Sequence, residues 1–129
     1  MTLLELLVLS IASTLGAVCR HLLATYFYDE KATYQLGILI ANLMGAYLIG
    51  LYLGYVQSSS NISPLYKLLI TTGFLGSLTT FSTFSLEIVV LLQKAFMLQA
   101  ILLLTAHVLG ALCCTYLGIW TIQAFFVQS

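Results

Sequence analysis

Apolar residues fall into four long stretches along this chain, and short polar stretches separate them. The polar stretches are Asp29–Lys31, Gln57–Asn61 and Gln93–Lys94, and Pro64 lies just before the third apolar stretch. A helix needs about 20 apolar residues to cross the hydrocarbon core of a bilayer. We therefore predict a single all-α integral membrane domain over residues 1–129, with four transmembrane helices at about 3–28, 35–56, 65–92 and 97–126.

The composition supports a protein surrounded by lipid. Hydrophobic residues make up 61% of the 129 residues and charged residues 6%, whereas soluble domains carry about 25% charged residues. The formal net charge is zero, so the sequence offers no basic surface for a nucleic acid. Cys19, Cys113 and Cys114 lack the spacing of a disulfide or metal motif, and we interpret them as small packing residues.

Loop charges specify the orientation in the membrane only weakly. Four spans place both termini on one side, with Lys67 on that side and Lys31 and Lys94 on the other. The positive-inside rule orients a protein by the difference in loop Lys and Arg, which here is about one residue. So small a difference permits insertion in both orientations.

Small residues recur at every fourth position in the second and fourth predicted helices, a pattern that lets helix backbones approach closely in lipid. They are Ala46, Gly50 and Gly54 in one helix, and Gly110, Cys114 and Gly118 in the other. Two interpretations are open, packing inside one subunit and a dimer interface. Because four largely apolar helices enclose little space, we expect a polar pathway to require a second copy.

The third apolar stretch contains six hydroxyl side chains between Ser77 and Ser85, behind Gly73 and Gly76. Isolated hydroxyls can bond back to their own helix. Six together predict an unwound stretch at mid-membrane, which is tolerated only where it is buried in protein or lines a polar cavity. The freed carbonyls around Gly76 and Thr79 could then face a cation, as unwound segments do in transporters.

Phe81 and Phe84 lie three residues apart in this stretch and so share one helical face. An aromatic ring has a positive edge. Ring edges and hydroxyls together could therefore replace part of the water around a small anion. Such a pair alone is typical of a core or lipid-facing position, and only the hydroxyl-rich surroundings favour an ion pathway.

Three further polar residues lie within the predicted spans. Asn42 is midway along the second helix, where its amide could line a pathway or bond to another helix. Arg20 and Glu87 lie toward the side that carries Lys31. A charge at this depth normally faces the interior with a partner, so pairing of Arg20 with Glu87 or with a carbonyl is favoured over direct ion contact.

His107, Ala111 and Thr115 form one stripe along the fourth helix, with polar residues at both ends. A lone histidine at such a position is more often a core residue whose ring nitrogens are hydrogen-bonded within the protein than a ligand of an ion. No second ligand has metal-binding spacing with it.

The run Gly73–Glu87 reads G-x-x-G-x-x-T-T-F-S-T-F-S-x-E and resembles the Fluc (CrcB) fluoride channel family. The similarity extends over the whole chain, through Gly16 and Arg20, the Asn-Leu-Met-Gly of residues 42–45 and the His-Val-Leu-Gly of residues 107–110. The motif of the third helix is highly specific. The others are weak singly but occur in the order the family has them.

This resemblance implies an antiparallel, dual-topology homodimer, or a heterodimer of oppositely inserted homologous subunits, with two narrow pores. It implies passive export of toxic fluoride across the inner (plasma) membrane, driven by the membrane potential. The expected partners are fluoride, the inverted second subunit and the lipid bilayer.

By the same resemblance, Phe81 and Phe84 would coordinate fluoride with their ring edges, and Asn42 would hydrogen-bond it. Carbonyls of Gly76 and Thr79 from both subunits would hold a structural sodium ion at the dimer centre. The remaining residues assigned to the fluoride pathway are Ser82, Thr83, Ser85, His107, Thr115 and Glu87, with Arg20 supporting the pore entrance or the dimer.

Two positions depart from the family pattern. Ala111 stands where the family often carries a hydroxyl, and Ile38 stands where threonine is common. Both changes weaken a polar track, so one pore could be poor, or the subunit could work beside a different partner. Homodimerisation remains the leading hypothesis.

Two other functions compete with a channel. A small multidrug-type proton-coupled exporter needs a carboxylate deep in its first helix, but Glu5 lies at the edge and Arg20 is the buried charge. A non-transporting membrane scaffold would explain the small-residue faces but leaves the clustered hydroxyls unexplained. An enzyme is not expected, because the sequence has no evident nucleophile–base pair or metal cluster.

Overall fold

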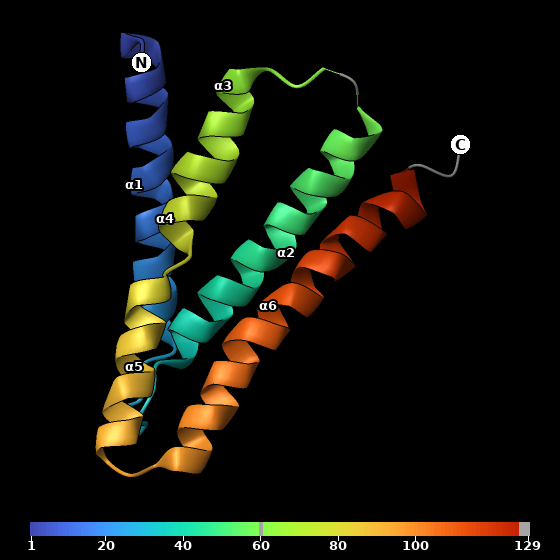
Figure 1. Ribbon diagram of the computed structural model, residues 1–129. Helices are drawn as coiled ribbons and strands as arrows, with labels where there is room; N and C mark the ends of the chain where they lie inside the picture. Colours follow the sequence, from blue (N-terminus) through green and yellow to red (C-terminus); the bar gives the residue numbers. More distant parts are fainter. Residues whose placement is uncertain (60, 127–129) are drawn as a thin grey trace.

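The computed structural model describes residues 1–59 and 61–126, and within these residues the ordered elements are all helical (Figure 1). Four helical segments are long and apolar enough to cross a membrane, which confirms the predicted class. Three of them are single helices, α1 (Leu3–Tyr26), α2 (Leu36–Ser58) and α6 (Met97–Phe126). The third consists of α3 (Pro64–Lys67), the π-helical η1 (Leu68–Leu75), α4 (Gly76–Leu78) and α5 (Phe81–Gln93).

Local sequence signals explain where two of these segments begin. Thr2 and Glu5 form a capping box at the start of α1: the Thr2 hydroxyl accepts from the Glu5 amide at 3.2 Å, and the Glu5 carboxylate accepts from the Thr2 amide at 2.7 Å. Ser63 caps α3 by accepting from Leu65, and Pro64 occupies the first turn, where no amide hydrogen is needed.

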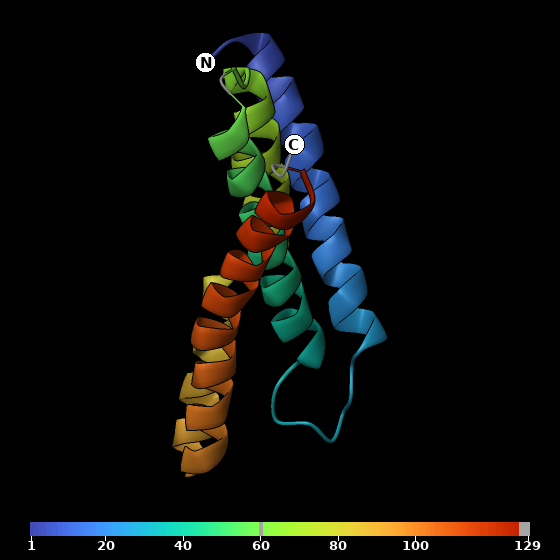
Figure 2. The ribbon, with the colours of Figure 1, turned by 90° about the vertical axis from the view of Figure 1, so that its right-hand side faces the viewer.

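The helices form two closely packed pairs that diverge toward the end carrying the N-terminus (Figure 1), and the loop between α1 and α2 lies at the opposite end (Figure 2). One pair is α1 with η1 and α4, and the other is α2 with α6. Beyond the break after α4, the third segment changes partner, because α5 packs against α6. The break therefore lets one transmembrane segment join both pairs.

Small residues bring the helices of each pair into backbone contact. In the α2–α6 pair, Gly50 lies against the backbone of Thr115, and Gly118 lies against the backbone of Tyr47. In the other pair, Gly16 lies against the carbonyl of Phe74. The small-residue faces of α2 and α6 thus serve packing inside one subunit, which answers the question that their spacing left open.

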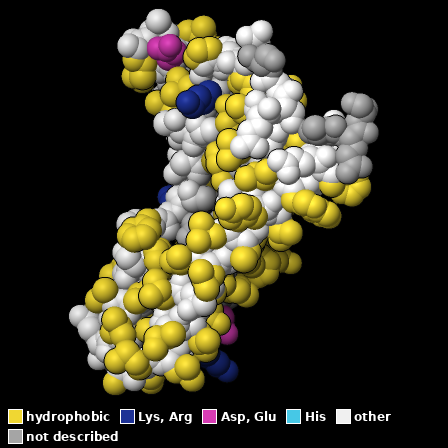
Figure 3. Space-filling view, turned by 45° about the vertical axis from the view of Figure 1, so that its right-hand side comes forward, with side chains coloured by type: hydrophobic (Ala, Val, Ile, Leu, Met, Phe, Trp, Pro, Cys, Tyr) yellow, Lys and Arg dark blue, Asp and Glu magenta, His cyan; other side chains and the backbone are white. Residues whose placement is uncertain are grey.

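Most large apolar side chains lie on the outside of the molecule. Figure 3 shows hydrophobic side chains spread over the surface, with charged ones mainly near the two ends. Among the described residues, the interior holds two small apolar clusters, one around Ala41, Leu75 and Leu78 and another around Leu91 and Leu103. A surface of this kind suits contact with acyl chains, where burial of apolar groups is not required.

The turn between α5 and α6 is tight and has one unusual residue. The Ala95 amide donates to the Leu92 carbonyl at 3.0 Å, and the Phe96 amide donates to the Leu91 carbonyl at 2.9 Å. This pattern of bonds ends a helix with one residue in the left-handed conformation, where glycine is usual. Here Ala95 occupies it, with φ of 60°.

Candidate ion-binding groove at the break in the third segment

The helix of the third segment is interrupted at two residues. Thr79 has φ −87° and ψ 152°, and Thr80 has φ −146° and ψ 122°, so both are extended. The Thr79 amide still donates to the Leu75 carbonyl at 3.1 Å, and α5 begins at Phe81. The predicted unwinding of the hydroxyl-rich stretch is therefore confirmed.

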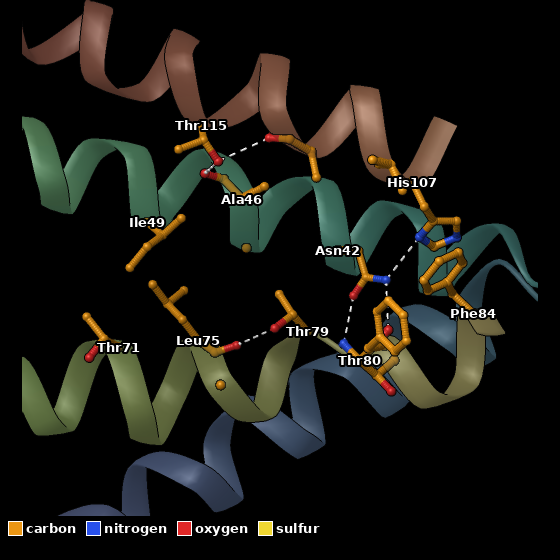
Figure 4. Close-up of a pocket in the computed structure, with 15 residues that line it drawn as sticks. Asn42, Ala46, Ile49, Thr71, Leu75, Thr79, Thr80, Phe84, His107 and Thr115 are labelled. Atoms are coloured by element: carbon orange, nitrogen blue, oxygen red, sulfur yellow. Dashed lines mark hydrogen bonds between the residues drawn. The ribbon is translucent and has the colours of Figure 1, made fainter. Parts of the chain in front are cut away.

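The side chain of Asn42 takes over the hydrogen bonds that the helix loses at Thr80. The Thr80 amide donates to Asn42 Oδ1 at 2.7 Å, and Asn42 Nδ2 donates to the Thr80 carbonyl at 3.0 Å (Figure 4). In an uninterrupted helix the Thr80 amide would donate to the carbonyl of Gly76. Because Thr80 is buried, these two bonds satisfy main-chain groups that have little access to water.

Thr80 also starts the next helix, a role that the sequence interpretation did not assign to it. Its hydroxyl accepts from the Thr83 amide at 3.3 Å, as an N-cap residue does. The same oxygen lies 3.2 Å from the hydroxyls of Ser82 and Thr83. A hydroxyl residue directly before a helical restart was the signal that could have identified it.

Two aromatic contacts adjoin the break. The rings of Phe81 and Phe84 meet edge to face, with centroids 5.0 Å apart and planes at 83°. Phe84 also stacks on His107, with centroids 4.6 Å apart and planes at 25°. Phe84 is buried, whereas Phe81 is 76% exposed in the single chain.

These groups line a groove of about 460 Å³ between the two helix pairs. In Figure 4, Thr71 and Leu75 on η1 and Thr79 at the break face Ile49 and Ala46 on α2 across the groove, with Asn42, Thr80 and Phe84 at one end. The groove is where the pairs begin to diverge, so the break, the amide of Asn42 and the aromatic rings meet at one place.

The hydroxyls of the groove-lining threonines 71, 79 and 115 donate to main-chain carbonyls. Thr79 donates to the Leu75 carbonyl at 2.9 Å, and Thr71 donates to the Lys67 carbonyl at 2.8 Å. The Thr115 hydroxyl lies 3.1 Å from the Ala46 carbonyl and 3.0 Å from the carbonyl of residue 111, one turn earlier in α6. These side chains therefore offer oxygen lone pairs to the groove rather than free hydrogen-bond donors.

The structure brings together only part of the predicted pathway. The residues from that set that line the groove are Asn42, Gly76, Thr79, Phe81, Phe84, His107 and Thr115, together with Ala111. Ser82, Thr83 and Ser85 are not among the lining residues. Ser85 donates to the Ser82 carbonyl at 3.1 Å, which is the local bonding that hydroxyls in helices commonly make. Ile38 is buried and lies outside the groove lining.

The two intramembrane charges have separate partners. Arg20 donates from Nη1 to the carbonyl of Thr79 at 3.4 Å, so a carbonyl rather than Glu87 receives its guanidinium. Glu87 is buried and accepts from the amide of Gln35 at 2.9 Å through Oε1. Glu87 and Gln35 also line a second cavity, of about 190 Å³, beside the loop between α1 and α2.

A membrane segment that unwinds beside a groove with polar groups in its lining, and whose main-chain groups are held by a neighbouring helix, is typical of membrane proteins that transport ions. Residues 7–119 match the family model described as CrcB-like protein, Camphor Resistance (CrcB). The chain belongs to this CrcB family. It is accordingly a multi-pass protein of the inner membrane.

Curated relatives cover nearly the full length of the chain, and each carries the name fluoride-specific ion channel FluC. One from Tolumonas auensis is 43% identical over 92% of this chain and 94% of its own length. One from Polynucleobacter asymbioticus is 41% identical over 94% and 97%. One from Escherichia coli O17:K52:H18 is 43% identical over 92% and 94%.

Proposed function

We propose that this protein is the subunit of a passive, fluoride-selective channel. The full-length relatives named as fluoride channels support this function. The observation that carries it in this chain is the groove in which Phe81 and Phe84 lie directly after a break in a transmembrane segment. A channel of this kind would let the membrane potential drive fluoride out of the cytoplasm, where fluoride accumulates after HF enters and ionises.

The chemistry of the groove suits a small anion. Fluoride must lose most of its water to pass between helices, and the positive edges of aromatic rings can replace part of that shell. Electrostatic attraction to a ring edge is stronger in a membrane interior than in water because the local dielectric constant is low. We assign the ring-edge contacts to Phe81 and Phe84, as the family resemblance implies.

A second copy in inverted orientation would complete the pathway. Phe81 is 76% exposed, although it lines a groove with buried polar groups at its end. An exposed ring beside such a groove supports a partner surface there. We propose an antiparallel homodimer with two pores, and a heterodimer with a homologous subunit is the alternative.

Freed main-chain oxygens at the break support the proposed sodium site. The Thr80 amide, which would bond the Gly76 carbonyl in a continuous helix, is taken by Asn42. The Thr79 carbonyl is also freed, and Arg20 shares it. Main-chain carbonyls are the ligand type that holds sodium in unwound membrane segments. The residues therefore fit the ion, which we propose bridges two subunits through Gly76 and Thr79.

The proposal is tested by fluoride efflux from liposomes that contain purified protein, followed with a fluoride electrode and with chloride as the control anion. Wild-type protein should release fluoride and retain chloride. Phe81→Ile and Phe84→Ile should each lower fluoride flux by about tenfold or more, if a desolvated contact between fluoride and a ring edge is taken to be worth the ~2 kcal/mol of a desolvated cation on a ring face. Leu86→Ile, at an exposed position on the same helix, should leave the flux unchanged. A folded wild-type dimer that releases no fluoride would refute the function.

A further inference from the structure

The orientation of the Asn42 amide is determined by what it contacts. The Thr80 amide can only donate, so the Asn42 atom 2.7 Å away must be the oxygen. The Thr80 carbonyl can only accept, so the Asn42 atom 3.0 Å away must be the nitrogen. Both ends of the amide are therefore assigned by main-chain partners on another segment.

This orientation in turn determines which nitrogen of His107 carries the proton. Asn42 Nδ2 has two hydrogens, and one goes to the Thr80 carbonyl. The other points to His107 Nδ1, 3.1 Å away. Nδ1 must therefore accept, and the proton of the neutral ring lies on Nε2.

The Nε2–H group is then a donor with nothing to donate to. Among the described residues, Nε2 of His107 is buried and has no hydrogen-bond partner, and the side chain as a whole is 4% exposed. Figure 4 shows this nitrogen on the side of the ring away from Asn42, next to Phe84. A buried donor without an acceptor costs free energy, so the site is complete only when an acceptor is present.

Asn42, by contrast, has no donor left to offer. Its two amide hydrogens go to Thr80 and to His107. The groove-lining hydroxyls of Thr71, Thr79 and Thr115 point to carbonyls. The hydroxyl of Thr80, which also lines the groove, lies within bonding distance of the hydroxyls of Ser82 and Thr83. The only other buried side-chain atom without a partner among the described residues is Glu87 Oε2, an acceptor when ionised. An anion near the stacked rings therefore finds its donor at His107 and not at Asn42.

We propose that His107 Nε2–H is the hydrogen-bond donor for the permeating anion, and that Asn42 is a positioning residue that orders this proton through the main chain of Thr80. The inference rests on the proposed channel function for the identity of the anion, but not for the position of the proton. It changes the expected role of Asn42 from ligand to support. The series of hydrogen bonds that runs from the helix break through Asn42 to the His107 ring then holds the Nε2–H donor in place for the anion.

The first test is the ¹⁵N spectrum of histidine-labelled protein in lipid bilayers, measured by solid-state NMR. The His21→Gln variant removes the other histidine, which is exposed on α1, so that the remaining signal is His107. We expect a neutral ring protonated on Nε2, whose Nε2 resonance moves with added fluoride and not with added chloride. In Asn42→Asp, which cannot donate to Nδ1, the proton should move to Nδ1. A wild-type ring protonated on Nδ1, or an Nε2 signal indifferent to fluoride, overturns the proposal.

The second test compares fluoride flux in three variants. Glutamine can place an amide N–H near the position of Nε2, whereas asparagine reaches only the position of Nδ1. His107→Gln should therefore stay within about threefold of wild type, while His107→Asn and His107→Leu should fall by about tenfold or more, the loss expected for one hydrogen bond to an ion. Size-exclusion chromatography confirms that each variant remains folded. Equal flux in the Asn and Gln variants would overturn the role of Nε2.

The two tests also separate this proposal from the channel function. If wild-type protein carries no fluoride, the channel function fails, whatever the ¹⁵N spectrum shows. If wild-type protein carries fluoride but the ring is protonated on Nδ1, the channel function stands and the present proposal fails.

Discussion

The third transmembrane segment and α6 are equally long, 30 residues each, and both are strongly apolar, yet only the third is broken. Both contain threonines. In α6, Thr121 donates to the carbonyl of Leu117, and Thr115 lies within bonding distance of the carbonyl four residues earlier, so the helix continues. In the third segment, Thr80 has its main-chain groups bonded to Asn42 and its hydroxyl used to cap α5.

Hydroxyl side chains alone therefore do not unwind a membrane helix. The break requires a partner on another helix that satisfies the freed main chain, and a residue that can start the helix again. Asn42 supplies the first and Thr80 the second.

Removal of the partner should have the largest effect. Asn42→Leu leaves the buried amide and carbonyl of Thr80 unpaired, and each unmet group costs about 1–3 kcal/mol. We expect a loss of about 2–6 kcal/mol in the free energy of unfolding, measured by denaturant titration in detergent micelles. Met44→Leu, at an exposed position on the same helix, is the matched control and should unfold like wild type. Equal stability of the two variants would show that the break does not depend on Asn42.

Loss of the cap should have a smaller effect. Thr80→Val keeps the shape of the side chain but cannot accept from the Thr83 amide, so we expect a destabilisation of about 1 kcal/mol. Thr80→Ser keeps the hydroxyl and should remain close to wild type. The same unfolding titration distinguishes the two, and a Ser variant as unstable as the Val variant would mean that packing of the methyl group matters more than the cap.

A substitution in the turn between α5 and α6 should raise the stability of the protein rather than lower it. Ala95 adopts φ of 60°, a conformation that glycine reaches without strain. Ala95→Gly should therefore stabilise the protein by about 0.5–1 kcal/mol after the greater flexibility of unfolded glycine is allowed for. Ala124→Gly, within α6, should not stabilise it, because glycine weakens a helix interior. A shift in the same direction for both variants would contradict this explanation.

The smallest effect is expected in the helix that stays continuous. Thr115→Val removes the hydroxyl bond from α6 to the Ala46 carbonyl on α2. Because that hydroxyl is shared with its own helix, and bonds between membrane helices average about 0.6 kcal/mol, we expect a loss of about 0.5 kcal/mol. A much larger loss would show that this bond holds the α2–α6 pair together and that glycine packing is secondary.

Several features followed from the order of residues alone. Length and hydrophobicity are properties of contiguous segments, so the four spans were predicted with ends within two residues of those observed. The clustered hydroxyls of the third stretch likewise predicted the break, because local competition for main-chain hydrogen bonds depends on neighbours in sequence. The family resemblance rested on the same stretch.

Other features depended on groups that are distant in the chain and meet only in the folded protein. Thr80 is 38 residues from Asn42, and His107 is 65 residues from it. Their hydrogen bonds therefore could not be read from spacing, nor could the meeting of Arg20 with the Thr79 carbonyl. Ser82, Thr83 and Ser85 resembled pathway residues in sequence but lie outside the groove lining. A hydrophobic segment is determined by residues that are neighbours in sequence, whereas the partner of a polar atom depends on which distant segments pack together. For this reason the tertiary structure alone decided which polar atoms meet.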